Sequence, residues 1–227
     1  MIILKSQDEI KRMAEACRIV AEVLEGVRKG IVPGVKTLEI DKFTESSIIS
    51  RGAKPAFKGY RGYPASVCIS VNEQVVHGIP SSVRLREGDI VSLDIGVYYK
   101  GFYGDAALTL PAGKIDAQAE RLLAATERSL YRGIEKAMPG NRLSDVSAAI
   151  QDCVEEAGYS VVRNFVGHGI GRELHEEPQI PNFGRPGEGP ELREGMTLAI
   201  EPMVNAGGWE VKVLEDGWTT VTKDGSL

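Results

Sequence analysis

The stretch Arg86–Asp94, with the sequence REGDIVSLD, has a counterpart 107 residues later, Arg193–Glu201, with the sequence REGMTLAIE. Each stretch begins with Arg-Glu-Gly, continues into a short apolar run and ends on an acid. Each also follows a His-Gly-Ile tripeptide, which begins at His77 in one case and at His168 in the other. Short apolar runs that follow turn residues are typical of buried strands. The repetition therefore predicts two related halves, each with an acid at the same place in a strand.

The helices predicted before these strands repeat as well. A capping box, Ser6–Glu9, opens a first helix whose apolar side chains recur every three or four residues: Ile10, Met13, Cys17, Val20, Leu24 and Val27. A second helix is predicted from about Thr37 to Gly52. In the second half, a long helix is predicted from about Asp116, and then a helix capped by Ser144 that stops at Gly158.

Four pairs of positions in these helices and turns are separated by 106 residues: Pro33-Gly34 and Pro139-Gly140, Ile40 and Val146, Ile48 and Val154, Gly52 and Gly158. Two ordered sets with nearly one offset indicate an internal duplication. We therefore expect one α+β domain over residues 1–227, with halves of roughly 1–112 and 113–227.

Composition excludes several classes of function. The 227 residues carry a net charge of −5, so no basic footprint for nucleic acid or an anionic membrane is present. The start acquires charges too soon for a secretory signal, and no apolar run reaches the length of a membrane span. Three cysteines without a CxxC motif favour a reducing cytoplasm, and Cys17 and Cys153 are expected to be free buried thiols.

Asp94 and Asp105 flank a predicted hairpin whose turn is Tyr99-Lys100-Gly101. A hairpin centred between Tyr99 and Lys100 pairs the two acids directly across the strands, on one face. Like charges in that position destabilise a sheet unless a cation lies between them or one takes a proton. The arrangement predicts a site for a divalent metal ion.

The alternative is that Asp94 and Asp105 are ordinary acids on a solvated face. Two observations favour the metal site. Asp94 lies inside an apolar strand, and Glu201 occupies the matching place between Ile200 and Pro202. An acid in a buried strand is costly unless it is paired or bound to a metal.

All three histidines of the chain lie beside glycines, turn residues or acids. His168 stands between two glycines, which allow a ligand to approach the backbone closely. His175 follows seven residues later in Glu-Leu-His-Glu-Glu-Pro, and His77 stands in Val-Val-His-Gly-Ile-Pro. A core or surface histidine is the commoner role for any one of them. A ligand set of nitrogen and oxygen without cysteine suits Mn, Fe(II), Co or Zn.

Six fragments, taken in order, resemble the type I methionine aminopeptidases of the bacterial short form: VH77GIP, SLD94IG, GD105AA, GH168GIG, H175EEP and AIE201PM. The resemblance spans essentially the whole chain. It implies the pita-bread (creatinase/aminopeptidase) fold, in which two pseudo-symmetric halves surround a central metal site. It also implies a metal-dependent exopeptidase that removes the initiator methionine from nascent chains whose second residue is small.

The resemblance assigns roles to individual residues. The metal ligands would be Asp94, Asp105, His168 and Glu201, which would hold two divalent ions of Co, Mn, Fe(II) or Zn. Glu201 would also transfer a proton, and His77 and His175 would contact the scissile amide. The methionine pocket would contain Tyr60, Tyr63, Cys68, Leu174 and Trp218. Leu174 stands where many relatives carry phenylalanine, which affects a pocket wall and no metal ligand.

One expected ligand is absent from the sequence. The family carries a second bridging glutamate on a strand after the Lys-Asp-Gly-Ser-Leu turn, and the sequence ends at Leu227, within that turn. The duplication indicates the same gap, because Asp94 has a partner acid on the returning strand and Glu201 has none. We expect that the chain is truncated and that a bridging glutamate follows Leu227 in a longer form.

Two other functions fit parts of the pattern. A proline-directed peptidase of the same fold would share the ligands but carry a large N-terminal domain. A catalytically inactive pita-bread protein that binds peptide or ribosome surfaces would have lost ligands, whereas the four expected before residue 227 are present. We therefore expect a monomeric cytoplasmic enzyme that acts on the N-terminal methionine of nascent peptides and associates transiently with the ribosome.

Overall fold

The computed structural model describes all residues from 1 to 227 and contains four α-helices and twelve strands. The helices are α1 (Gln7–Arg28), α2 (Thr37–Ser50), α3 (Ala117–Lys136) and α4 (Leu143–Glu156), with a short 3-10 turn, η1, at Tyr60–Gly62. The strands are β1 (Lys54–Pro55), β2 (Cys68–Val71), β3 (Gln74–Val76), β4 (Asp89–Tyr99), β5 (Phe102–Ala112), β6 (Ser160–Val161), β7 (Gly167–Gly169), β8 (Glu176–Ile180), β9 (Leu198–Ala199), β10 (Val204–Asn205), β11 (Val211–Val213) and β12 (Thr220–Thr222).

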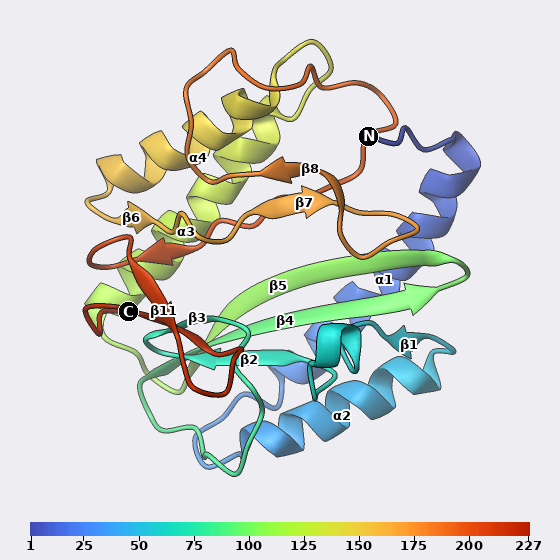
Figure 1. Ribbon diagram of the computed structural model, residues 1–227. Helices are drawn as coiled ribbons and strands as arrows, with labels where there is room; N and C mark the ends of the chain where they lie inside the picture. Colours follow the sequence, from blue (N-terminus) through green and yellow to red (C-terminus); the bar gives the residue numbers. More distant parts are fainter.

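The helices enclose the strands from two sides (Figure 1). Helix α2 lies below the long hairpin of β4 and β5, and α1 descends from the upper right and passes behind it. Helices α3 and α4 lie at the upper left, on the side of β6, β7 and β8. Strands β1 and β2 pair with different stretches of one edge of β4, and β5 pairs with its other edge. No helix has the length and apolar character that crossing a membrane would require.

The hairpin of β4 and β5 has a different register from the one expected. Tyr99 pairs with Phe102, so Lys100 and Gly101 form a two-residue turn, and both have positive φ angles, 48° and 90°. Two-residue hairpin loops of this kind match the twist of the strands. As a result Asp94 pairs with Ala107, and Asp105 pairs with Gly96. The predicted direct pairing of Asp94 with Asp105 is wrong; they are diagonal neighbours on the same face.

The two faces of β4 have different roles. Val91, Leu93, Ile95 and Val97 are fully buried in a core that they share with α1 and α2. Side chains of a strand alternate between its faces. Asp94 therefore points to the opposite face, toward the second half of the chain.

The two halves share local features at the offsets found in the sequence. The amide of Gly34 donates to the carbonyl of Leu85, and the amide of Gly140 donates to that of Leu192. Isolated bridges join Lys36 with Arg84 and Arg142 with Glu191. Gly34 and Gly140 both have φ of 93°, a conformation that glycine adopts without a steric penalty.

The second half departs from the expected elements in two places. Helix α4 begins after Arg142, which corresponds to Lys36 at the start of α2. Ser144 therefore lies inside α4 and does not cap it, contrary to the prediction. The Ser144 hydroxyl instead exchanges hydrogen bonds with the backbone of Glu188. Strand β9 spans only Leu198–Ala199, so Glu201 lies just beyond its end rather than within a strand.

The first helix buries most of the face that the sequence predicts, including Met13, Val20, Leu24 and Val27. Ser6 caps it through the expected capping box with Glu9. Cys17 is exposed, because Ala16 occupies the buried position instead. Cys68 and Cys153 are buried, and all three cysteines are free thiols.

Candidate metal centre and substrate pocket

Three side chains from the two halves converge at the centre of the molecule. Ligand atoms of Asp105 on β5, His168 on β7 and Glu201 after β9 all lie within 4.8 Å of one another. Nε2 of His168 lies 3.6 Å from Oδ2 of Asp105 and 3.1 Å from Oε1 of Glu201. A nitrogen and two carboxylates at this spacing form a set that can hold a divalent metal ion.

Backbone contacts orient the ring of His168. Strand β7 lies between β8 and β9, with His168 opposite Gln179 and Ala199. Nδ1 of the ring lies 2.8 Å from the carbonyl oxygen of Gly169. In the metal-bound form a proton on Nδ1 would make this hydrogen bond, and Nε2, which faces the two carboxylates, would offer its lone pair to the ion. Metal-bound histidines commonly use their second nitrogen in this way.

Two carboxylate oxygens of the cluster lack partners within the protein. Oδ1 of Asp105 and Oε1 of Glu201 are buried without a hydrogen bond. The 3.1 Å approach of His168 to Oε1 of Glu201 therefore does not have hydrogen-bond geometry. Buried polar atoms normally find partners. Unpartnered oxygens that face a common centre are consistent with a bound cation.

The pKa values of the ionisable side chains in the cluster also indicate a site for a cation. Burial, and then the charges of Asp105 and Glu201, raise the pKa of Asp94 well above its usual range. Burial also raises the pKa of Glu201. For His168, burial alone would lower the pKa, but the nearby carboxylates of Asp105 and Glu201 raise it to about 10. Without a cation the cluster therefore favours bound protons, and a divalent ion held there would take their place.

His77 has an unusual backbone conformation. Its φ is 60°, in the left-handed region that is uncommon for residues other than glycine. Its ring meets those of Phe165 and Trp218 edge-on, at centroid distances of 5.3 and 6.3 Å. Gly78 follows, and a Cβ there would overlap the carbonyl of Ile69. Burial lowers the pKa of His77, so its ring is neutral at neutral pH.

His175 lies next to His168. Its ring centroid is 4.3 Å from that of His168. Its Nδ1 lies 2.7 Å from the hydroxyl oxygen of Tyr60. Burial, and then the charge of His168, lower the pKa of His175 to about 4. The ring is therefore neutral at neutral pH, with Nδ1 bound to Tyr60 and Nε2 free of protein partners.

The five residues expected to form the substrate pocket lie in one apolar cluster. Tyr63, Cys68 and Leu174 are buried in it, with exposed fractions of 3%, 5% and 1%. Tyr60 and Trp218 pack against it while partly exposed. The hydroxyl of Tyr63 donates to the carbonyls of Gly78 (2.8 Å) and Val67 (3.2 Å). Its ring meets Trp218 edge-on at 5.1 Å.

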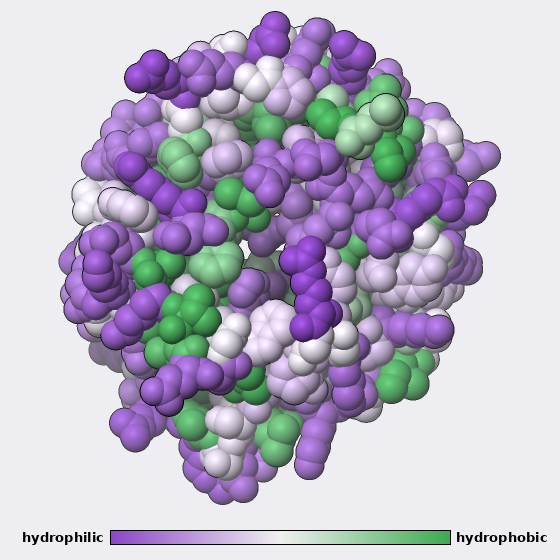
Figure 2. Space-filling model, in the orientation of Figure 1, coloured by the Kyte–Doolittle hydropathy of each residue, from purple (hydrophilic) through white to green (hydrophobic).

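Cys68 connects this cluster to the acids, because it pairs with Asp94 across β2 and β4. An apolar surface that is joined in this way to a group of acids and histidines suits a small substrate with one apolar side chain. On the face shown in Figure 2, hydrophilic side chains predominate and a hollow opens near the middle. In Figure 1 this position lies between the levels of β7 and β5.

Two residues of the site were not predicted. Asn182 is fully buried, and its Nδ2 donates to the carbonyl of Glu201 at 2.7 Å, which fixes the segment beyond β9. Phe165 packs on His77. Its place three residues before His168 was a signal that could have identified it, whereas nothing in the surrounding sequence distinguishes Asn182.

Comparison with known proteins gives a consistent result. Residues 11–222 match the model of metallopeptidase family M24. A methionine aminopeptidase from Clostridium perfringens is 56% identical over all of this chain and 91% of its own length. Methionine aminopeptidase 1 from Bacillus subtilis is 54% identical over 99% of this chain and 91% of its own length.

Solved structures agree with these relatives. The crystal structure of methionine aminopeptidase from Thermotoga maritima matches with a TM-score of 0.98 and 52% identity, over 100% of this chain and 91% of that one. A prolidase from Pyrococcus furiosus matches with a TM-score of 0.78 and 25% identity, over 97% of this chain and 65% of the prolidase. The expected pita-bread fold is confirmed, and the chain belongs to metallopeptidase family M24 and, within it, to the methionine aminopeptidases.

Proposed function

We propose that this protein is a metal-dependent aminopeptidase that removes N-terminal methionine from peptides and nascent chains with a small second residue. The observation that carries the proposal is the convergence of Asp105, His168 and Glu201 beside one apolar cluster. Family membership and the names of the relatives support the same activity.

The metal ligands in this proposal are Asp94, Asp105, His168 and Glu201, which would hold two divalent ions of Co, Mn, Fe(II) or Zn. The donor set fits such ions, because it combines hard carboxylate oxygens with one imidazole nitrogen and includes no thiolate. Divalent ions in such a site lower the pKa of water and polarise a carbonyl.

The protein's own groups would bind the peptide and move protons. Nε2 of His175, left free by the contact of Nδ1 with Tyr60, would donate to the scissile amide. His77, neutral and held by Phe165 and Trp218, would contact the same amide from the other half. Glu201 would accept the proton of the attacking water at Oε1, since a carboxylate with a raised pKa is a better base.

Selectivity for methionine would come from the cluster of Tyr60, Tyr63, Cys68, Leu174 and Trp218. An unbranched thioether side chain fills an irregular apolar pocket well and contacts aromatic ring edges favourably. The rings of Tyr63 and Trp218 supply such edges. A free α-amine close to the acids would restrict cleavage to the first peptide bond.

We expect the enzyme to be monomeric, to work in the cytoplasm and to meet its substrates as they leave the ribosome. The three free cysteines are consistent with a reducing compartment. The net charge of −5 is consistent with binding peptide rather than nucleic acid.

The experiment that tests this proposal measures metal content and methionine release on the same preparation. Purified protein loaded with Mn or Co should release methionine from Met-Ala and Met-Gly peptides and much less from Met-Lys peptides. Peptides with an Xaa-Pro bond should remain intact. Bound metal without release would support an inactive binding protein, and cleavage of Xaa-Pro bonds would support a proline-directed peptidase.

A further inference from the structure

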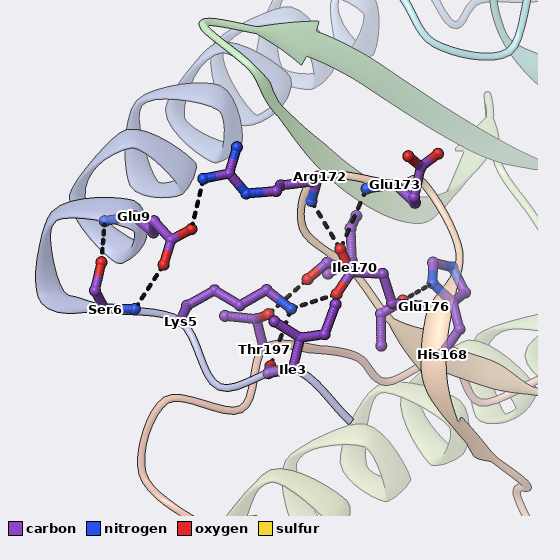
Figure 3. A network of polar contacts seen from close by, with 11 residues as sticks. Ile3, Lys5, Ser6, Glu9, His168, Ile170, Arg172, Glu173, Glu176 and Thr197 are labelled. Atoms are coloured by element: carbon purple, nitrogen blue, oxygen red, sulfur yellow. Dashed lines mark hydrogen bonds and ion pairs between the residues drawn. The ribbon is translucent and has the colours of Figure 1, made fainter. Parts of the chain in front are cut away.

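Lys5, in the segment before α1, has its side chain buried in the second half of the protein. Nζ of Lys5 binds the carboxylate of Glu176, and the two side chains are only 3% and 6% exposed. The same ammonium donates to the carbonyl of Ile3. Figure 3 shows Lys5 reaching from the end of α1 to Glu176, which directly follows His175 in the chain.

The carboxylate of Glu176 also binds the backbone at the start of the loop that leads to His175. Its Oε1 accepts hydrogen bonds from the amides of Arg172 (2.8 Å) and Glu173 (3.2 Å). Its Oε2 takes the contact with Lys5. One carboxylate therefore holds both ends of the segment 172–176, and its charge is neutralised by a residue 171 positions away in the sequence.

Two glycines of the second half allow this close packing. A Cβ at Gly171 would overlap Cε of Lys5, and one at Gly195 would approach the carbonyl of Lys5 at 2.9 Å. The amide of Lys5 donates to the carbonyl of Gly195 at 2.7 Å. Gly195 ends the second Arg-Glu-Gly motif, so this motif serves as the docking point for the N-terminal segment.

A second contact, exposed to solvent, also joins the N-terminal part of the chain to this loop. The guanidinium of Arg172 binds Glu9 at 2.9 Å and lies over the ring of Phe102. The side chain of Arg172 is 61% exposed. Exposed ion pairs contribute little, whereas removal of one partner from a buried pair leaves an uncompensated charge. Of the two contacts, the buried pair is the one able to fix the loop.

We propose that the Lys5–Glu176 pair is a positioning device that holds the ring of His175 against the metal centre, so that the N-terminal segment of the first half sets the geometry of a histidine in the second. This inference rests on the role of His175 given under the proposed function. Lys5 and Glu176 touch no substrate, and they act through the backbone of the loop and the residue next to Glu176.

The decisive experiment is a double-mutant cycle between Lys5 and His175, with turnover of a Met-Ala peptide and metal content measured for each variant. Lys5→Met keeps the length of the apolar stem and removes the charge. It should lower kcat about tenfold or more, since small displacements of a catalytic group cost this much. KM and bound metal should change less than about twofold. In the His175→Ala background, Lys5→Met should have no further effect on kcat.

Lys11→Met is the matched control, because Lys11 lies on α1 with a side chain that is 76% exposed and should tolerate the change without loss of turnover. If Lys5→Met does not fold, Glu176→Gln replaces it in the cycle, since the amide oxygen still accepts from Arg172 and Glu173.

With only three histidines in the chain, their ring NMR signals provide a direct readout of ring position. The signal of His175 should shift in Lys5→Met, and that of His77 should not.

Unchanged kcat in both Lys5→Met and Glu176→Gln would overturn the inference. An equal loss of kcat in the wild-type and His175→Ala backgrounds would also overturn it, because the pair would then act by another route. Full turnover of His175→Ala alone would instead refute the role of His175 in the proposed function, and that result is recognised without any Lys5 variant.

Discussion

Nε2 of His168 lies 3.6 Å from Oδ2 of Asp105, although the two residues belong to different halves of the duplicated chain. Asp105 is on the returning strand of the first hairpin, and His168 is on a three-residue strand of the second half. Neither half contains the complete set of ligands. A cation bound here would therefore join the halves, and its binding energy would add to the stability of the whole fold.

Asp105→Asn should have opposite effects on stability with and without metal. Without metal, the wild-type cluster carries a buried carboxylate oxygen that has no partner. Removing that charge should leave stability unchanged or raise it. With Mn or Co in about hundredfold excess over Kd, the wild type should gain about 2.7 kcal/mol of unfolding free energy. The variant should gain almost nothing.

Urea unfolding with chelator and with metal measures both effects. Asp8→Asn is a suitable control, since the side chain of Asp8 is 80% exposed and should not alter the gain from metal. Equal stabilisation of Asp105→Asn and the wild type by metal would show that Asp105 is not a ligand.

His77→Ala and His175→Ala should separate catalysis from metal binding. Both rings are neutral at neutral pH. The ring of His175 lies against that of His168, and the ring of His77 packs on Phe165 and Trp218. Each variant should retain metal and lose about 10²–10⁴-fold in turnover, the usual effect of removing an acid–base or polarising group. Metal analysis and peptide assays on the same samples provide the test. Loss of metal from either variant would make that histidine a ligand instead.

The sequence predicted the parts of the site that rest on local patterns. Helix caps, turn glycines and the alternation of β4 depend on neighbouring residues, so the capping box at Ser6, the face of β4 and the hairpin near Lys100 were all identified. The exact register was not. It depends on which two residues adopt positive φ, and Lys100 with Gly101 does so rather than Tyr99 with Lys100.

Features that depend on tertiary contacts could not be predicted from local sequence patterns. Glu201 was expected in a strand because its counterpart Asp94 is in one, but the second copy keeps only a two-residue strand there. The side chain of Asn182 binds the backbone of Glu201 across 19 residues. The partner of Lys5 is 171 residues away. Contacts of this kind become visible only when both halves are folded.

Two glycines near α1 should respond in opposite ways to alanine. Gly104 faces α1, and a Cβ there would lie 2.8 Å from the backbone of Ala16 and Cys17. Gly104→Ala should cost about 1–3 kcal/mol, because neither backbone can yield easily. Gly26 lies within α1, where a Cβ would meet only the ring of Phe43 at 3.5 Å. Gly26→Ala should stabilise the protein by about 0.5–1 kcal/mol through helix propensity. Unfolding midpoints that shift in the same direction would contradict this packing.

The buried pair of Lys5 and Glu176 should make stability depend on pH in a defined window. Burial alone would raise the pKa of Glu176, but hydrogen bonds from Lys5 and the loop amides hold it below the ordinary value of 4.5. A carboxyl group with a lowered pKa stabilises the folded state above its unfolded pKa, and the contribution is lost as pH falls through the folded value.

Glu176→Gln should therefore be less stable than the wild type by about 3–5 kcal/mol at neutral pH, because it leaves the Lys5 ammonium buried and unpaired. This difference should stay constant down to about pH 5 and then narrow below 4.5, as the wild-type carboxyl takes up a proton. Urea unfolding in the presence of chelator, from about pH 7 to pH 3.5, measures the gap without a contribution from metal. A gap that remains the same across this range would mean that the shape of the Glu176 side chain, and not its charge, holds the loop in place.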